Sequence, residues 1–222
     1  MLMKQQRNHS KACIFDFDST IVSIETLDFL ISNIAGQGNL KIHEITNQAM
    51  GGNLSFGESL RMRFASAQLT KKYVIQMQSV ICEYITQGAV DNFIKLKDAH
   101  DLYIISGGFL EIIHPVAEKL QIPKENCFAN EFLYNNEDII GYNSLNPLAD
   151  SGGKPKVVKN IQNNYEKIFM IGDGYTDLEV SKVIPSIIFC GFGQHAIRPA
   201  VLNESKHFFY NFEDLTTFIL KS

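Results

Sequence analysis

Four short apolar runs are spaced along the chain, and each one ends at polar or glycine residues. They cover residues 12–17, 102–105, 168–171 and 187–190. Continuous apolar runs of this length are typical of strands buried on both faces of a sheet. Apolar positions with helical spacing lie between them, over residues 88–98, 109–120, 154–165 and 175–183. Strands that alternate with helices predict an α/β fold, with a three-layer, Rossmann-like parallel sheet covered on both faces.

Two segments interrupt this alternation. Residues 22–86 contain several helical stretches and no convincing strand, so we expect a small helical cap domain inserted after the first strand. Residues 127–142 place two consecutive asparagines between apolar arms, which predicts a β-hairpin. The predicted core domain therefore comprises residues 1–21 and 87–222.

Acidic and hydroxyl side chains follow directly after three of the predicted strands. They are Asp16 and Asp18, Ser106, and Asp173 and Asp177. In an open parallel sheet, ligands bind outside the carboxyl ends of the strands. We therefore expect these residues, which are far apart in sequence, to converge in one crevice.

The first two aspartates favour a metal site. Strand residues two apart point the same way, so the carboxylates of Asp16 and Asp18 are expected to meet. Two anions this close require a cation or a shared proton, and a hard divalent ion such as Mg²⁺ takes oxygen ligands. Asp173, which lies between two glycines, adds a third carboxylate. A loop of solvated aspartates is the alternative.

A phosphate site is predicted at the second strand end. Ser106 offers a hydroxyl, and Gly107 and Gly108 offer backbone N–H groups at the start of a helix, a geometry that holds phosphate oxygens. Lys154 could add a cation to the same oxygens. A plain turn at Ser106 and a solvated lysine at a helix start are the alternatives.

Composition narrows the class of partner. The chain has 222 residues, 45% of them apolar and 20% charged, with a formal net charge of −4 and no block of Lys or Arg. It therefore gives no electrostatic reason to expect nucleic acid, and it suits a small anionic ligand held by a few placed cations.

The cellular location is predicted from three further features. The start of the chain is polar without an apolar core, and no run approaches the roughly 20 apolar residues of a membrane span. The four cysteines are widely scattered, which favours reduced core residues over disulfides or zinc ligands. We expect a cytoplasmic protein with no membrane partner, either a monomer or a homodimer.

The order of these motifs resembles that of the haloacid dehalogenase-like phosphatases, and in particular the phosphoserine phosphatase family. The matching segments are Asp16–Thr20, Ser106–Phe109, Gly152–Lys154 and Gly172–Asp177. The resemblance implies that Asp16 attacks phosphorus to form an aspartyl-phosphate, and that Asp18 protonates the leaving group and then deprotonates water. It further implies Mg²⁺ held by Asp16, the backbone carbonyl of Asp18 and Asp173, with Asp177 in support.

The predicted cap contains an arginine that could bind a substrate carboxylate. At helical spacing, Phe56, Leu60 and Phe64 share one face, and Arg63 points into the middle of it, whereas Arg61 points away. A buried arginine requires an anionic partner, which could be a substrate carboxylate or an internal salt bridge.

The family resemblance extends to substrate binding. It implies that Glu25 meets the substrate ammonium group and Arg63 its carboxylate, that Met50 and Gly51 belong to a loop over the ligand, and that Thr176 contacts the substrate. An ordinary acidic residue at a helix start is the alternative for Glu25. The implied reaction is hydrolysis of O-phospho-L-serine to L-serine and phosphate, the last step of serine biosynthesis.

One residue departs from the family pattern. Tyr175 stands where these phosphatases usually have a small residue, and its phenol could narrow the pocket or contact a different leaving group. The alternatives are therefore the same chemistry on another small phosphorylated metabolite, phosphotransfer to an alcohol acceptor, or a non-catalytic sensor that kept the fold.

Overall fold

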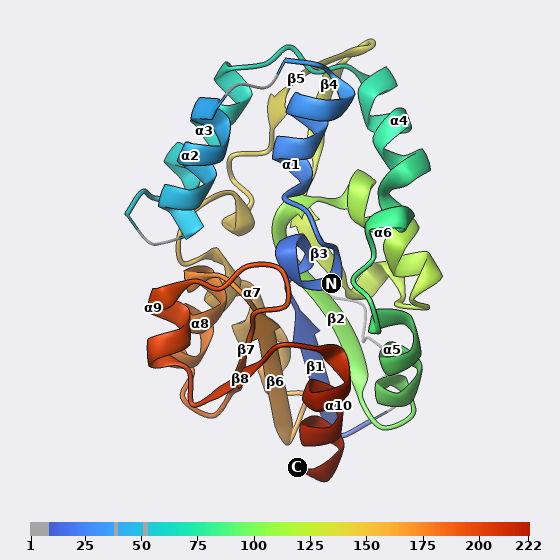
Figure 1. The fold of residues 1–222 in the computed structure, drawn as a ribbon, viewed down its shortest axis with the longest axis vertical. Helices are drawn as coiled ribbons and strands as arrows, with labels where there is room; N and C mark the ends of the chain where they lie inside the picture. The colour runs from blue at the N-terminus through green and yellow to red at the C-terminus, as the bar shows by residue number, and fades with distance from the viewer. Residues whose placement is uncertain (1–8, 38–39, 51–52) are drawn as a thin grey trace.

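A six-stranded parallel sheet forms the centre of the core (Figure 1). The computed structural model describes residues 9–37, 40–50 and 53–222. Along the sheet the strands follow the order β3-β2-β1-β6-β7-β8. Their bounds are β1 Lys11–Phe15, β2 Asp101–Phe109, β3 Cys127–Asn130, β6 Lys167–Gly172, β7 Ile188–Phe192 and β8 His207–Phe209.

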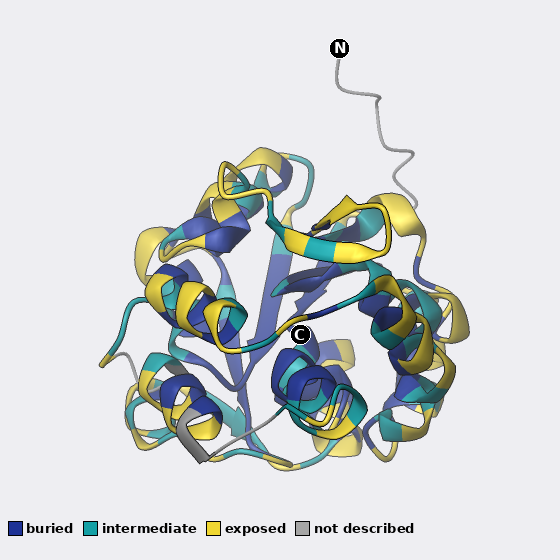
Figure 2. Cartoon of the chain, turned by 90° about the horizontal axis from the view of Figure 1, so that it is seen from above, coloured by how far each residue is buried: buried dark blue, intermediate teal, exposed yellow. Residues whose placement is uncertain are grey.

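Successive side chains of the central strands enter opposite faces of the sheet, as the period of a strand requires. In β1, Cys13 and Phe15 pack on one face, and Ala12 and Ile14 pack on the other. Helices cover both faces, and Figure 2 shows their buried sides turned toward the sheet. The first face is covered by α5 (Ala89–Lys97), α6 (Leu110–Lys119) and α10 (Phe212–Lys221), and the second by α7 (Gly153–Gln162), α8 (Tyr175–Val183) and α9 (Pro199–Glu204).

A helical insertion follows β1 and lies beyond the carboxyl ends of the strands, at the top of Figure 1. The two segments that connect it to the core pair with each other: Val22 forms a β-bridge with Ile85, and the Thr86 amide donates to the Ile21 carbonyl over 2.9 Å. The α/β fold with a helical insertion after the first strand is therefore confirmed. The irregular turn η1 Phe17–Ile21 leads into it, and its elements are α1 Thr26–Phe29, η2 Leu30–Ile34, α2 Leu40–Met50, α3 Phe56–Ala65, α4 Lys71–Val80 and η3 Ile81–Tyr84.

The hairpin predicted over residues 127–142 is wrong in its first part. Residues 127–130 form β3, which pairs in parallel with β2 at the edge of the main sheet. The hairpin consists only of β4 (Phe132–Asn135) and β5 (Asp138–Tyr142). An apolar arm contains no local signal for its pairing partner, so the sequence pattern joined two strands that belong to different sheets.

The end of the second strand also differs from the prediction. β2 continues through Ser106, Gly107 and Gly108 to Phe109, with a register shift against β3 between Ile105 and Phe109. The two glycines therefore lie in an irregular strand end rather than at the start of a helix, because α6 begins only at Leu110. The apolar pattern of the sequence did not predict five further elements, namely β8, α9, α10, η4 (Lys124–Asn126) and η5 (Pro147–Ala149).

The four cysteines are free in the structure, and Cys13, Cys127 and Cys190 are buried, as expected for core residues. In the described part of the chain, no helix combines the length and the apolar character that a membrane span requires.

A cluster of phenylalanines joins the sheet to helices α5 and α10. The Phe93 ring lies 4.5 Å from that of Phe15 and 5.7 Å from that of Phe212, measured between ring centroids, and Phe93 is fully buried. The neighbouring Ile94 on the same helix is 48% exposed. The two positions therefore differ in burial while they share a helix and an apolar character.

We expect Phe93→Ala to lower the free energy of unfolding by about 3–5 kcal/mol, because it removes a buried ring and leaves a cavity. Ile94→Ala, the matched control, should change it by less than about 1 kcal/mol. Urea unfolding followed by circular dichroism measures both. Equal losses in the two variants would contradict this assignment of the core.

Candidate active site

The carboxyl ends of β1, β2 and β6 bring the predicted site residues together. Asp16 follows β1, Ser106 lies in the last part of β2, and Asp173 follows β6. After β1 the chain adds β2 and β3 on one side of it, and later β6, β7 and β8 on the other. The strand order therefore reverses between β1 and β6, and open α/β sheets bind ligands at such a point. Asp16, Asp18 and Ser106 line one pocket there, together with Lys154. Asp173 and Asp177 adjoin it through Asp16, so the convergence of the strand ends that the pattern predicted is observed.

A tight turn after β1 orients the first aspartate. The Asp16 amide donates to the Ile171 carbonyl over 2.8 Å, and its Oδ1 accepts from the Phe17 amide over 2.8 Å. The following residues form the irregular turn η1, in which Ser19 has a positive φ of 53°. This φ is uncommon for a residue with a side chain. Asp16 and Asp18 therefore face one pocket because of this turn, rather than because they alternate along a strand.

Lys154 lies between two buried carboxylates. Its Nζ is 2.8 Å from Asp16 Oδ1 and donates to Asp177 Oδ1 over 2.6 Å. Burial works against the charge of this ammonium group, but Asp16 and Asp177 more than offset it and raise the pKa of Lys154. With 6% of its surface exposed, Lys154 is not the solvated lysine of the alternative reading.

Three carboxylates form a compact acidic group. Oxygens of Asp16, Asp173 and Asp177 all lie within 4.8 Å of one another, and all three residues are buried. Burial, with Glu25 and Asp16 next, raises the pKa of Asp173 well above its ordinary value. Burial, with Asp16 next, raises the pKa of Asp177 to about 7. These buried carboxylates outnumber the cations around them, and such a group of oxygens fits a hard divalent cation. Their burial excludes the alternative of a loop of solvated aspartates.

A glycine is required beside this group. A Cβ on Gly172 would lie 2.2 Å from Asp177 Oδ2, a separation that no side chain can adopt. The same oxygen accepts from the Gly174 amide over 3.1 Å, which fixes the carboxylate at the start of α8. The glycine in this motif therefore lets Asp177 approach the end of β6 and reach Lys154.

Asp18 lies in the pocket in an environment that favours its protonated form. Burial, with Glu25 and Asp16 next, raises the pKa of Asp18 well above its ordinary value. Its Oδ1 is buried without a hydrogen-bond partner. A carboxyl group of this kind can hold a proton, as a general acid must.

Ser106 and the two glycines form the floor of the pocket. Ser106 is buried, and its Oγ accepts from the Gly108 amide over 3.0 Å, which leaves the hydroxyl proton for another acceptor. A Cβ on Gly107 would lie 2.2 Å from the Phe56 ring of the cap. Phe56 can therefore cover the site only because residue 107 has no side chain.

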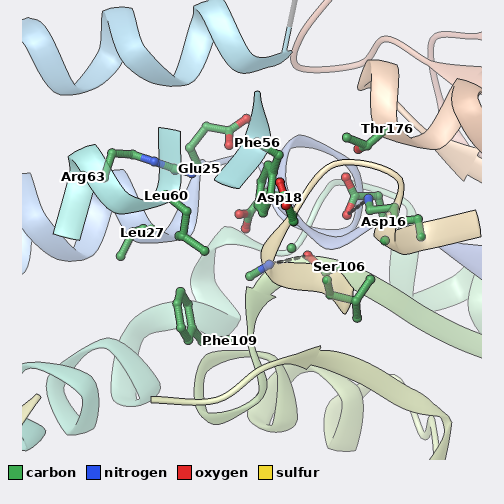
Figure 3. Close-up of a pocket in the computed structure, with 16 residues that line it drawn as sticks. Asp16, Asp18, Glu25, Leu27, Phe56, Leu60, Arg63, Ser106, Phe109 and Thr176 are labelled. Carbon is green, nitrogen blue, oxygen red and sulfur yellow. Dashed lines mark hydrogen bonds and ion pairs between the residues drawn. The ribbon is translucent and has the colours of Figure 1, made fainter. Parts of the chain in front are cut away.

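The cap supplies the other wall of the pocket. In Figure 3, Arg63 approaches from the side opposite Asp16, and Glu25 and Asp18 lie between them. Glu25 precedes α1 but makes no side-chain cap to it, and its Oε1 accepts instead from Ser19 Oγ over 2.8 Å. Glu25 thus lies at a helix start, as the alternative had it, and it is also tied to the site through Ser19.

Arg63 has an internal partner in this structure. Its Nη1 lies 3.3 Å from Asp28 Oδ1, and its Nε donates to the Ser59 carbonyl over 3.4 Å. Arg63 is buried and lines the pocket, whereas Arg61 is exposed, as the helical spacing predicted. The internal salt bridge and the place in the pocket are thus both present.

The remaining predicted substrate residues fall into two groups. Thr176 lines the pocket. Gly51 and the side chain of Met50 lie outside the described residues. Tyr175 is not among the described residues that line the pocket: it packs against the apolar cluster around α7 and α8, with Lys182 Nζ 4.8 Å from its ring centroid. The expectation that its phenol narrows the pocket is therefore wrong.

Two charged residues of the site were not predicted. Asp28 lies three positions after Glu25, on the first cap helix, and pairs with Arg63. Arg198 follows the fourth predicted strand and contacts both Asp173 and Glu25. The segment after β7 also lies at the carboxyl end of a strand, so the tendency of ligands to bind there points to it as well.

Comparisons with known proteins agree with this geometry. The sequence model of the haloacid dehalogenase-like hydrolases matches residues 13–182, most of the chain. The chain belongs to that family. Among these hydrolases it is similar to human phosphoserine phosphatase, with 37% identity over 211 residues that cover 92% of this chain and 91% of the human protein. The mouse phosphoserine phosphatase is 35% identical over 208 residues, which cover 92% and 91% of the two chains.

A solved structure has a closely similar fold. It is a phosphoserine phosphohydrolase-like protein from Francisella tularensis, with a TM-score of 0.87, 32% identity, and 94% of this chain and 99% of that one covered. The chain is therefore a member of the phosphoserine phosphatase family of these hydrolases, as the motifs indicated.

The raised pKa of Asp177 predicts how the stability of the metal-free protein depends on pH. The folded state holds the proton of Asp177 more tightly than the unfolded state does, so this proton stabilises the folded protein. Its contribution to the free energy of unfolding is complete below the ordinary pKa near 3.8 and is lost as pH rises to about 7. We expect Asp177→Asn, which has no titrating carboxyl group at this position, to flatten this dependence. Urea unfolding in EDTA between pH 4 and 8 measures it, and parallel profiles for variant and wild type would contradict the assignment.

Proposed function

We propose that this chain hydrolyses O-phospho-L-serine to L-serine and phosphate through an aspartyl-phosphate on Asp16. The observation that carries the proposal is the single pocket in which Asp16, Asp18 and Lys154 of the core meet Glu25 and Arg63 of the cap. Phosphoserine phosphatases that match 92% of the chain support the choice of substrate.

The contacts of Asp16 select the oxygen that attacks. Phe17 N–H and Lys154 Nζ both contact Oδ1, and neither contact uses Oδ2. Oδ2 of the carboxylate would form the bond to phosphorus while the bond from phosphorus to the serine oxygen breaks. Water would then attack the phosphorus of the intermediate, and breaking of its bond to Oδ2 would release phosphate and restore Asp16.

Asp18 would move the proton in both steps. Its raised pKa keeps a proton available for the leaving serine oxygen, and the carboxylate that results can accept one from the attacking water. Because Glu25 is among the causes of this raised pKa, the substrate-binding side of the pocket helps to set the acidity of Asp18.

We propose that Mg²⁺ is the cofactor, held by Asp16, Asp173 and the backbone carbonyl of Asp18. When bound, this ion would neutralise charge as the anionic nucleophile approaches the phosphate dianion. Asp177 supports the site by fixing Lys154, at 2.6 Å. Lys154, the Ser106 hydroxyl and the strand end at Gly107 and Gly108 would contact the phosphate oxygens.

The cap would recognise the serine part of the substrate. Glu25 would bind the ammonium group, and Arg63 would bind the carboxylate. The internal contacts of Arg63 use Nη1 and Nε, so neither occupies Nη2, which would bind the substrate carboxylate. Thr176, Met50 and Gly51 complete the proposed substrate contacts.

The alternative substrates lose their main support. Another phosphate ester was suggested by Tyr175, whose side chain packs away from the pocket. The cytoplasmic location, the monomeric or homodimeric state and the separate cap domain at residues 22–86 stay predictions.

Asp16→Asn should lower the rate of phosphate release from O-phospho-L-serine by about a thousandfold or more, because an amide cannot serve as the nucleophile. EDTA should abolish the activity of the wild type, and added Mg²⁺ should restore it. A phosphate-release assay with a panel of small phosphate esters checks both. A faster reaction with an ester that lacks the amine would contradict the proposed substrate.

Arg63→Ala should lower kcat/KM for O-phospho-L-serine by about 10- to 100-fold, the effect of a lost charged hydrogen bond, and change that for a neutral aryl phosphate much less. Arg61→Ala removes an exposed arginine from the same helix and should leave both values within about twofold. Because Arg63→Ala also leaves Asp28 unpaired, Asp28→Asn with Arg63 intact serves as a second control. Equal losses on the two esters would exclude the carboxylate contact.

A further inference from the structure

One arginine outside the predicted motifs joins three parts of the site. Arg198, at the N-terminus of α9, donates from Nε to Asp173 Oδ2 over 3.3 Å and from Nη2 to Glu25 Oε1 over 3.3 Å. Its Nη1 donates to Asn47 Oδ1 over 3.1 Å. Each of its three nitrogens thus contacts a different residue.

These three partners come from the two sides of the pocket. Asp173 follows β6 of the core, Glu25 precedes the first cap helix, and Asn47 lies on α2 of the cap. Among the ion pairs of residues 9–37, 40–50 and 53–222, those of Arg198 alone join a carboxylate of the acidic group to one of the cap. The Arg198 side chain is 15% exposed, so water weakens these contacts only in part.

The charge of Arg198 separates two acids that repel one another. After burial, Glu25 is the next cause of the raised pKa of Asp173. The positive charge of Arg198 acts in the opposite direction and lowers the pKa of both Asp173 and Glu25. The planar guanidinium can serve diverging acceptors from fixed directions, which a lysine ammonium on a flexible stem cannot do.

The contacts also leave one oxygen of Glu25 available. Ser19 Oγ and Arg198 Nη2 both donate to Oε1, and neither contact uses Oε2. An ammonium group in the pocket could therefore bind Oε2 of a carboxylate that is already oriented, with less loss of side-chain entropy on binding.

We propose that Arg198 is a positioning residue that holds Glu25 and helix α2 of the cap against Asp173 of the core. Its part in substrate recognition rests on the proposed function, since it acts through the carboxylate assigned to the substrate ammonium. Its part in joining the cap to the core is independent of any substrate.

A guanidinium held beside Asp173 has a consequence for metal binding. Arg198 is a cation beside Asp173, so it opposes the binding of a second cation there. Loss of Arg198 should therefore leave the affinity for Mg²⁺ unchanged or make it higher, while substrate binding becomes weaker.

The test compares Arg198→Ala and Arg198→Lys with Lys206→Ala, which removes an exposed cation two residues beyond α9. For Arg198→Ala we expect KM for O-phospho-L-serine to rise about tenfold, as expected for a lost charged contact, with kcat changed less than threefold. KM for 3-phosphohydroxypropionate, which lacks the amine, should change less than threefold. Arg198→Lys should recover only part of the loss, and Lys206→Ala should match the wild type.

Two further measurements need no turnover. Hydrogen exchange of the α2 amides in the metal-free protein should become about tenfold faster in Arg198→Ala and also faster in Asn47→Ala, which removes only the cap contact. Titration calorimetry should give a Kd for Mg²⁺ that is unchanged or lower in Arg198→Ala.

The outcomes separate the two proposals. If the wild type does not hydrolyse O-phospho-L-serine, the proposed function fails, and α2 exchange still decides whether Arg198 holds the cap. Unchanged α2 exchange in Arg198→Ala would overturn the joining role. An equal rise in KM for the esters with and without the amine would overturn positioning through Glu25, and a large loss of Mg²⁺ affinity would assign Arg198 to the metal site instead.

Discussion

The ion pair between Lys154 and the carboxylates of Asp16 and Asp177 is the constraint on which the site depends. Three carboxylates lie buried at one sheet edge, and burial of like charges is costly unless positive charge is placed among them. Lys154 supplies that charge at 2.8 and 2.6 Å from Asp16 and Asp177. The lysine therefore makes it possible to keep the carboxylate of Asp16, the proposed nucleophile, in the interior, and the remaining negative charge favours a divalent cation.

The cap repeats this arrangement with its own charges. Arg63 is paired with Asp28, and Glu25 with Arg198, so both of these cap residues already have a charged partner. In Asp16 and in Glu25 the internal contacts converge on one oxygen and leave the other to a ligand. Half-satisfied carboxylates of this kind combine fixed orientation with free binding capacity, which a fully solvated or a fully paired group would lack.

Local patterns along the chain were sufficient for the central strands, the covering helices and the helical insertion. Apolar runs that end in aspartate or serine located Asp16, Ser106 and Asp173, and helical spacing separated Arg63 from Arg61. The same patterns failed at residues 127–130, because strand pairing depends on a partner that is remote in sequence. They also placed a helix start at Gly107 and Gly108, where β2 continues with a register shift instead.

The order of residues alone thus indicated the family, because its motifs resemble those of known phosphatases and each follows a strand whose apolar character can be recognised locally. Folding in three dimensions was needed to show which charges neutralise which. Arg63 and its partner Asp28 are 35 positions apart in sequence, and Arg198 and its partner Glu25 are 173 positions apart. Tyr175, conspicuous in the sequence, turns out to pack away from the pocket. Electrostatic pairing depends on distance in space and on burial, and neither quantity is encoded in the spacing of residues along the chain.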